Sequence, residues 1–394
     1  AVAVGAPTVL IALVLAVPTL RAALARLLHR ARVRRHLDVA ILSLPGILAE
    51  RRPRVRKVTR TTFGDRIELA LWRGTSVDDL AKVEGVLAAS LGVREVRVVA
   101  DASHRNLVTL SIIRRDPFGS ASLASPLLDV NRFSIWQPIP IGIDEDGEVV
   151  TLSLPERNVL IGGEPGAGKS VALSGLVAAC ALDSDVDLWL FDGKLVELTQ
   201  WSACAQSFVG PDVERAIEVL EDLRTNMDRR YQRLLGLGTR KVSRDGELRL
   251  NVVVIDELAL FVAGVDKKLA ARFSDLLRDL VARGRAAGVI VLAATQKPSV
   301  DIVPSALRDL FGFRWALRCA TRDASDTVLG SGWASQGFSS SDVAGSSRGA
   351  GLLLHEGEVP VRLRSFHLND AEIRVLAARA AHLRQDRAGT RGDR

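Results

Sequence analysis

The chain has 394 residues, of which 47% are hydrophobic and 25% are charged. This composition excludes an intrinsically disordered chain and supplies enough apolar surface for a large buried core. The formal net charge is +7, but residues 1–60 alone carry +10, because they hold twelve Lys and Arg residues and only two acids. The basic excess therefore adjoins the N-terminal apolar segment and is evidence about a membrane rather than about a nucleic-acid surface.

Residues 1–20 contain no charged side chain and are long enough to cross a bilayer as one helix. Six arginines follow between Arg21 and Arg35, and positive charge flanks the cytoplasmic ends of spanning helices. We therefore expect a transmembrane helix in the cell membrane, with the rest of the chain in the cytoplasm. A signal peptide would have its basic region before the apolar run, and Pro7 and Pro18 disfavour a buried core helix. Since the chain begins with Ala, a further spanning helix upstream is an open alternative.

Three regions are predicted between this helix and the main domain. Residues 21–60 are expected to form a basic, partly helical juxtamembrane connector. Residues 61–116 predict a small α/β platform domain without catalytic residues, and residues 117–148, which contain Ser, Pro and Gly, predict a linker. The platform elements are alternating strands at Arg66–Trp72, Val93–Val99 and Leu107–Ile113, and a helix from Val77 to about Leu91 that Ser76 caps.

Short apolar strands alternate with helices through residues 149–384. Uninterrupted apolar strands are typical of a sheet buried on both faces, and helices between them imply parallel order with crossovers. The predicted strands are Asn158–Ile161, Val186–Phe191, Val252–Ile255, Val289–Ala293 and Phe313–Leu317. The last helix is expected over about Asp370–Leu383, and residues 385–394 are expected to be a flexible tail. The three cysteines, Cys180, Cys204 and Cys319, form no metal-ligand pattern and are predicted to be reduced core thiols.

One motif in this region predicts a nucleotide site. Residues 163–170 match GxxxxGK[ST] and lie between a predicted strand and a predicted helix, the context in which this loop wraps phosphates with its backbone N–H groups. Lys169 is expected to neutralise the β- and γ-phosphates of ATP, and Ser170 to ligate Mg²⁺. The alternative is a glycine-rich turn that binds no nucleotide. The residues of the motif are Gly163, Glu164, Pro165, Gly166, Ala167, Gly168, Lys169 and Ser170.

Further polar residues follow two of the predicted strands. Asp256 is expected to hold the Mg²⁺ shell, and Glu257 to orient or deprotonate the attacking water. Thr295 and Gln296 are candidates for sensing the γ-phosphate, with a simple turn as the alternative. Together these residues predict a RecA-like P-loop NTPase of the α/β class. Because Lys169 is read as a loop charge outside the core, Lys169→Ala is expected to abolish ATP binding and leave the fold intact.

Hydrolysis in ring motors usually requires an arginine from the neighbouring subunit. Five arginines are candidates for this role: Arg283, Arg285, Arg308, Arg314 and Arg318. A helix over Val213–Leu235 carries Arg224, Arg229, Arg230 and Arg233 opposite an apolar stripe. That arginine face is interpreted as solvated surface or a subunit contact.

Residues of about 150–385 resemble the motor domain of FtsK/SpoIIIE-type DNA translocases. The resemblance includes the order and spacing of four segments beyond the P-loop: Asp192–Leu198 (Asp-x-Lys-x-x-Glu-Leu in the family), Met227–Tyr231 (Met-Glu-Arg-Arg-Tyr), Arg285–Gly288 (Arg-Ala-Ala-Gly) and Ala294–Asp301 (Ala-Thr-Gln-Arg-Pro-Ser-Val-Asp). It implies a homo-hexameric ring around double-stranded DNA, driven by ATP hydrolysis. It supports Lys169, Ser170, Asp256, Glu257 and Gln296 as nucleotide-site residues, and it favours Arg285 among the arginines.

The sequence also departs from the usual cell-division member of that family. Its P-loop begins Gly-Glu-Pro-Gly-Ala-Gly rather than Gly-Thr-Thr-Gly-Ser-Gly, and this sequence stops about where the motor is expected to end, whereas that member carries a winged-helix domain after its motor. The membrane–platform–motor layout and the composition are similar to the transfer proteins of actinobacterial conjugative plasmids and integrative elements. We therefore expect a membrane-anchored, ATP-driven translocase of double-stranded DNA for conjugation. The alternatives are a chromosome-segregation translocase, a coupling ATPase for protein secretion, and a nucleotide-switched scaffold.

Overall fold

The computed structural model describes residues 17–42, 47–101, 104–119 and 122–392. The chain divides into two compact units, residues 1–117 and 118–394, which are described separately below. The expected transmembrane helix over residues 1–20 lies almost entirely outside the described residues. Among the helices within the described ranges, none is long and apolar enough to cross a membrane.

The first unit is a four-stranded antiparallel sheet in the order β1-β2-β4-β3, with helices packed on one face. Leu37 and Ile41 of the long helix α2 are buried with Ile67 and Leu110 of the sheet in one apolar core. The strands are β1 (Arg54–Arg60), β2 (Gly64–Ala70), β3 (Glu95–Ala100) and β4 (Leu107–Ile113). The helices are α2 (Pro18–Leu42), α3 (Ile47–Glu50), α4 (Val77–Ala81) and α5 (Glu84–Leu91).

This unit corrects two boundaries expected from the sequence. The stretch 21–60 is not a connector, because α2 contributes core residues and β1 pairs antiparallel with β2 over most of its length. The single helix expected from Val77 is two helices, α4 and α5. Ser76 does cap α4: its hydroxyl accepts from the Asp79 backbone N–H, and the Asp79 carboxylate accepts from the Ser76 N–H.

The second unit is built on a ten-stranded sheet in the order β6-β5-β14-β13-β12-β7-β11-β10-β8-β9. The six strands from β12 to β9 run parallel, and the remaining four pair antiparallel. This confirms the α/β class and the predicted parallel order. The strands are β5 (Ile139–Asp144), β6 (Val149–Leu152), β7 (Val159–Gly162), β8 (Val186–Phe191), β9 (Ala205–Val209), β10 (Leu250–Ile255), β11 (Val289–Thr295), β12 (Phe313–Leu317), β13 (Ala350–His355) and β14 (Val361–Ser365).

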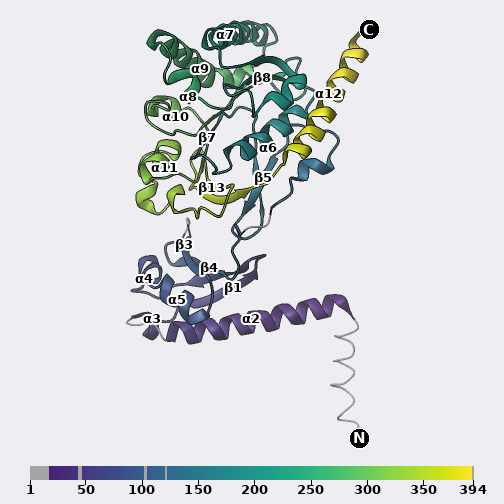
Figure 1. Ribbon diagram of the computed structural model, residues 1–394. Helices are drawn as coiled ribbons and strands as arrows, with labels where there is room; N and C mark the ends of the chain where they lie inside the picture. Colours follow the sequence, from purple (N-terminus) through teal and green to yellow (C-terminus); the bar gives the residue numbers. More distant parts are fainter. Residues whose placement is uncertain (1–16, 43–46, 102–103, 120–121, 393–394) are drawn as a thin grey trace. The chain divides into compact units, whose positions relative to one another are not determined.

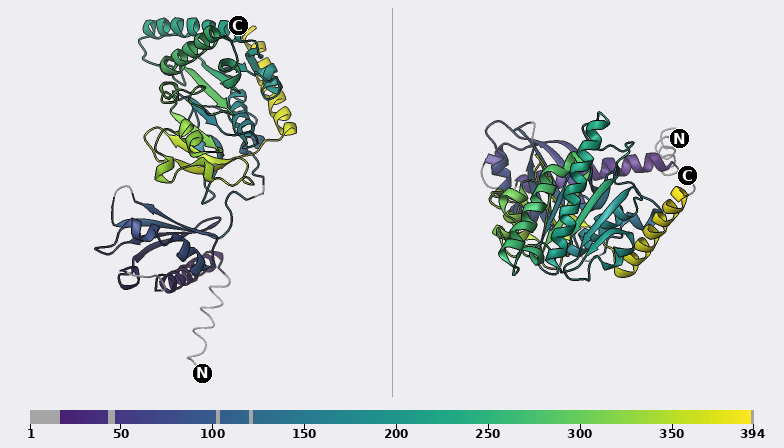
Figure 2. Two further views of the ribbon diagram at one scale, coloured as in Figure 1. Left: turned by 60° about the vertical axis from the view of Figure 1, so that its left-hand side comes forward. Right: turned by 90° about the horizontal axis from the view of Figure 1, so that it is seen from above.

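Helices cover both faces of this sheet (Figure 1). Residues alternate between the two faces along the central strand β10, so that Val252 and Val254 join one apolar core and Val253 and Ile255 join the other. Helices α6 (Lys169–Ala181) and α12 (Asp370–Gly392) lie on the first face. The opposite face carries α7 (Val213–Gly236), α8 (Ala259–Val262), α9 (Lys267–Ala287), α10 (Ser305–Arg308) and α11 (Arg322–Leu329). The view from above in Figure 2 shows these layers.

Three sequence expectations for this unit are wrong. The stretch 117–148 is not a linker, since it contains the 3₁₀ helix η1 (Pro126–Asp129) and β5, which pairs with β14 and β6. The tail expected from residue 385 continues as helix α12 to Gly392. Arg230 is buried rather than solvated: it donates from Nε to the Ala287 carbonyl at 2.6 Å and from Nη2 to the Arg249 carbonyl.

Candidate nucleotide-binding site

The P-loop joins the central strand β7 to helix α6. Gly166 and Gly168 have φ values of +79° and +103°, which L side chains rarely adopt. A Cβ at Gly168 would lie 2.8 Å from the backbone nitrogen of Gly349, and that N–H donates to the Ala167 carbonyl at 2.9 Å. The loop is therefore closed against the segment before β13, and glycine is required at position 168 both for its backbone angle and for space.

The loop borders a cavity of about 450 Å³ at the carboxyl ends of the parallel strands. This is the edge at which open α/β sheets bind ligands. Glu164, Gly166, Gly168, Lys169, Ser170 and Gln296 of the predicted site line it, and Ser122, Leu123, Val171, Arg348, Gly349, Arg364, Ser365 and His367 complete the lining. All these residues belong to the second unit.

Lys169 is buried and directed at the end of β10. Its Nζ lies 2.6 Å from Oδ1 of Asp256 and donates to the Asp256 carbonyl at 2.8 Å. Asp256 is fully buried, and its Oδ2 has no hydrogen-bond partner among the described residues. A buried carboxylate oxygen without a partner is costly in an apolar interior, and it is the type of oxygen that Mg²⁺ prefers.

Glu257 is buried beside Asp256 and held by the end of β11. Its Oε1 accepts from the Thr295 hydroxyl at 2.8 Å, and both carboxylate oxygens accept from the Gln296 backbone N–H at 3.0 Å. Lys194 Nζ lies 3.8 Å from Oε2. This carboxylate therefore has a fixed orientation, as a residue that positions water requires.

Ser170, the first residue after the P-loop lysine, contacts a residue that the site prediction omitted. Its hydroxyl donates to Oε1 of Glu197 at 2.7 Å. Lys194 and Glu197 both lie in the Asp-x-Lys-x-x-Glu-Leu segment that follows β8. The sequence pattern marked this segment, but only the adjacency of β8 and β10 in the sheet brings it to the nucleotide site.

These residues fit ATP and Mg²⁺. Ser170 and Asp256 supply oxygen ligands on neighbouring elements, Lys169 supplies a cation, and the P-loop supplies backbone donors. When bound, Mg²⁺ would contribute neutralisation of phosphate charge. The described residues hold no cluster of three or more His, Cys, Asp or Glu side chains suited to a metal, so a metal here would also need phosphate and water ligands.

The five arginine candidates lie in different places. Arg318 lies beside the chain's own P-loop, where its Nη2 is 2.5 Å from Oε1 of Glu164. Arg285 lies in the last turn of α9, at the amino ends of the parallel strands. Its side chain is 57% exposed and lies 3.7 Å from Glu156. The remaining three form local ion pairs: Arg283 with Asp228 and Asp279, and Arg308 and Arg314 with Asp309. Arg285 therefore does not contact the nucleotide site of its own chain.

Arg348 and Arg364 also line the P-loop cavity, and neither was predicted from the sequence as a site residue. Arg364 donates from Nε to the Arg348 carbonyl at 3.2 Å, and the Arg348 side chain is exposed. Arg348 lies just before β13, and Arg364 lies in β14. Both strands pair antiparallel with their neighbours in the sheet. No local motif marks these arginines, because only the folding of these strands against β12 brings them to the cavity.

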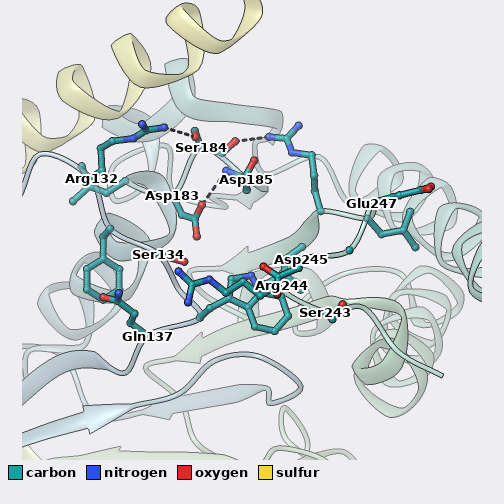
Figure 3. Close-up of a pocket in the computed structure, with 17 residues that line it drawn as sticks. Arg132, Ser134, Gln137, Asp183, Ser184, Asp185, Ser243, Arg244, Asp245 and Glu247 are labelled. Carbon is teal, nitrogen blue, oxygen red and sulfur yellow. Dashed lines mark hydrogen bonds between the residues drawn. The ribbon is translucent and has the colours of Figure 1, made fainter. Parts of the chain in front are cut away.

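A second cavity, of about 610 Å³, lies at the opposite edge of the sheet, between residues 132–137, 182–185 and 243–250 (Figure 3). Its buried acid Asp183 accepts from the backbone N–H groups of Ile135 at 3.0 Å and Asp185 at 2.9 Å. Arg132 donates to the Ser184 hydroxyl at 3.3 Å. These groups bind one another and contain none of the predicted hydrolysis residues, so we assign the nucleotide site to the P-loop cavity.

Comparison with known proteins agrees with this geometry. The family model described as FtsK/SpoIIIE family matches residues 121–328, which is more than half of the chain. A DNA translocase FtsK of Staphylococcus epidermidis is 26% identical over 344 residues, covering 80% of this chain and 41% of that protein. The chain thus spans about two fifths of the length of the curated relatives it matches.

Two solved structures share the fold. The monomer form of the pCW3 conjugation coupling protein TcpA with ATPγS has a TM-score of 0.59 and 19% identity, covering 89% of this chain and 98% of that one. EssC (ATPases 2 and 3) from Geobacillus thermodenitrificans has a TM-score of 0.55 and 17% identity, covering 67% and 52%. With its P-loop between β7 and α6 and its acidic pair after β10, this chain belongs to the FtsK/SpoIIIE family of P-loop ATPases.

Proposed function

We propose that this chain is an ATP-driven translocase of double-stranded DNA that acts in conjugative transfer. The observation that carries the proposal is the grouping of Lys169 and Ser170, which line the P-loop cavity, with the buried acids Asp256 and Glu257 in a member of this family. Asp256 accepts from the Lys169 ammonium, and Glu257 follows it in the chain. A mere nucleotide switch has no use for the oriented carboxylate of Glu257, so the site favours hydrolysis. Curated relatives named DNA translocase FtsK favour DNA as the load.

Conjugation is favoured over the other candidate functions by how much of the chain matches the conjugation coupling protein TcpA. The TcpA match spans nearly the whole of both chains, including a first unit before the motor, whereas the EssC match covers about half of a chain that holds two ATPase domains. Chromosome segregation and protein secretion are the competing functions. Deletion of the gene in its host should reduce transfer of the mobile element between cells and leave chromosome partitioning normal. A partitioning defect with normal transfer would favour segregation.

The primary test is the ATPase rate of the full chain with and without linear duplex DNA, at low and moderate salt. We expect strong stimulation by duplex DNA that weakens as salt rises, because DNA binding releases counterions. The matched control is Glu257→Gln, which should bind ATP with near-normal affinity and lose turnover with or without DNA. Turnover that ignores DNA would contradict the proposal and favour protein as the load.

Ring assembly and membrane attachment belong to the same proposal. A homo-hexamer would allow Arg285, exposed at the edge away from its own P-loop, to reach a neighbour's nucleotide. Mixing the inactive variants Arg285→Ala and Glu257→Gln should then restore part of the ATPase rate, and no restoration would exclude this arginine.

The apolar residues 1–20 support an anchor with the motor on the cytoplasmic side. A variant without them should leave the membrane fraction if they are the anchor.

A further inference from the structure

The segment between β8 and the 3₁₀ helix η2 (Thr199–Cys204), residues 192–198, is here named the β8 loop. It carries the family pattern Asp-x-Lys-x-x-Glu-Leu, with Asp192, Lys194 and Glu197 as its charged residues. The loop contacts two of the hydrolysis residues at once, Ser170 through Glu197 and Glu257 through Lys194. The spacing of the pattern follows from how the loop is held.

Asp192 anchors both ends of the β8 loop. Its carboxylate is fully buried, and its Oδ2 accepts from the Leu198 N–H at 2.8 Å while Oδ1 accepts from the Lys194 N–H at 3.2 Å. Leu198 itself is buried in the core. Between these anchors Leu195 has φ +59°, a left-handed conformation that is costly for leucine. The anchors and the turn direct the Lys194 and Glu197 side chains back to the nucleotide site.

Among the described residues, Asp256 and Glu257 each have a lysine close by, whereas Glu197 does not. Lys169 pairs with Asp256, and Lys194 lies within 3.8 Å of Glu257. The Glu197 carboxylate accepts from the Ser170 hydroxyl at 2.7 Å, but within the described ranges no Lys or Arg forms an ion pair with it. A half-buried carboxylate beside a phosphate site is stabilised by a cation. The buried and unpartnered Oδ2 of Asp256 is a second, independent observation that fits a cation ligand at this site.

We propose that Glu197 is a positioning residue for the magnesium ion of this ATPase. Its carboxylate accepts a hydrogen bond from the Ser170 hydroxyl, which directs the oxygen lone pairs of Ser170 away from Glu197 and makes them better ligands. Its second oxygen is available to accept from a metal-bound water. Such outer-shell partners typically change metal affinity about 10–100-fold when they are removed. The inference rests on ATP hydrolysis at the P-loop and is independent of the load.

The test is the affinity of the full chain for a fluorescent ATP analogue, measured with Mg²⁺ and again with EDTA. In Glu197→Ala we expect the Mg²⁺-supported affinity to fall about 10–100-fold and the metal-free affinity to stay unchanged. Glu197→Gln keeps the shape and one acceptor oxygen but loses the charge, so it should fall in between. Val196→Ala is the matched control, because Val196 lies in the same loop with a 68% exposed side chain; it should bind like the parent.

A cycle with Ser170→Ala tests whether Glu197 acts through the hydroxyl. The effects of Ser170→Ala and Glu197→Ala should be less than additive in Mg²⁺, since the second change removes an interaction already lost. Equal losses with and without Mg²⁺, or no loss in either Glu197 variant, would overturn the proposal. Thermal unfolding of each variant identifies a merely structural effect, which would lower the unfolding temperature without changing the dependence on Mg²⁺. No DNA enters this assay, so its outcome does not depend on the proposed translocation.

Discussion

At the residue scale, the P-loop lysine is part of a buried ion pair. Lys169 and Asp256 have side chains that are 2% and 0% exposed and lie 2.6 Å apart. The expectation that Lys169→Ala would spare the fold treated this residue as a loop charge, and the burial of the pair contradicts that reasoning. Removing one partner of a buried pair leaves an uncompensated charge, which typically costs about 3–5 kcal/mol.

We therefore predict that Lys169→Ala abolishes ATP binding and also lowers the free energy of unfolding by about 3–5 kcal/mol. The double variant Lys169→Ala/Asp256→Asn should recover part of that loss, because the remaining side chain is neutral. Urea denaturation monitored by tryptophan fluorescence measures the free energy of unfolding of the single and the double variant. If Lys169→Ala unfolds at the same urea concentration as the parent, the pair contributes little to stability and the variant is a clean binding control.

The sequence identified the P-loop, Asp256 and Glu257, because their roles are local to a strand end and the loop that follows it. The same signal cannot reveal Glu197 or Lys194, whose partners lie 27 and 63 positions away in the chain and meet them only through strand pairing. Arg348 and Arg364 were missed for the same reason. Arginine fingers are harder still, since their partner lies in another molecule.

At the element scale, two family segments join α7 to α9. Arg230 of α7 donates to the carbonyls of Ala287 and Arg249, and Tyr231 donates to the Arg283 carbonyl. Burial lowers the pKa of the Arg230 guanidinium. Gly288 ends α9 with φ +71°, and a Cβ there would lie 3.1 Å from Arg230 Nη2. These segments therefore have a structural reason for their residue types, apart from any role of Arg285.

We predict that Arg230→Leu destabilises the second unit by about 2–6 kcal/mol, because the buried carbonyl of Ala287 and the partly buried carbonyl of Arg249 each lose a donor at about 1–3 kcal/mol. The matched control is Arg229→Leu, since the neighbouring Arg229 is exposed and should change stability by less than about 0.5 kcal/mol. Urea midpoints at constant slope measure both variants. Equal midpoints for Arg230→Leu and the parent would show that water replaces the guanidinium without loss.

In the second unit, the strands predicted from the sequence were the predominantly apolar ones in the parallel part of the sheet, such as β8 and β10. Strands β5 and β14 were missed. They lie in the antiparallel part of the sheet, where polar and glycine residues interrupt the apolar run: Gly142 is required there because a Cβ would lie 2.1 Å from the Arg364 carbonyl oxygen. Helix α2 was missed as a core element because its few buried residues lie in a stretch that is rich in arginine.

At the scale of the whole molecule, each unit has an apolar core of its own. One cluster lies within residues 1–117, and two clusters on the faces of the large sheet lie within residues 118–394. The sequence placed the motor boundary at residue 149, whereas the second unit begins at residue 118 and includes η1 and β5. The family match begins at residue 121, in agreement with the structural boundary.

We predict that residues 118–394 alone fold and bind ATP with the affinity of the full chain, because every described residue of the P-loop cavity lies within them. A shorter fragment starting at residue 149 should aggregate or unfold at a lower temperature, because it lacks β5 and Ile135 and Ile139 of the core. Calorimetric unfolding and titration with the fluorescent ATP analogue compare the two fragments. Equal stability would mean that β5 adds nothing to the sheet, and weak binding by residues 118–394 would show that the first unit contributes to the nucleotide site.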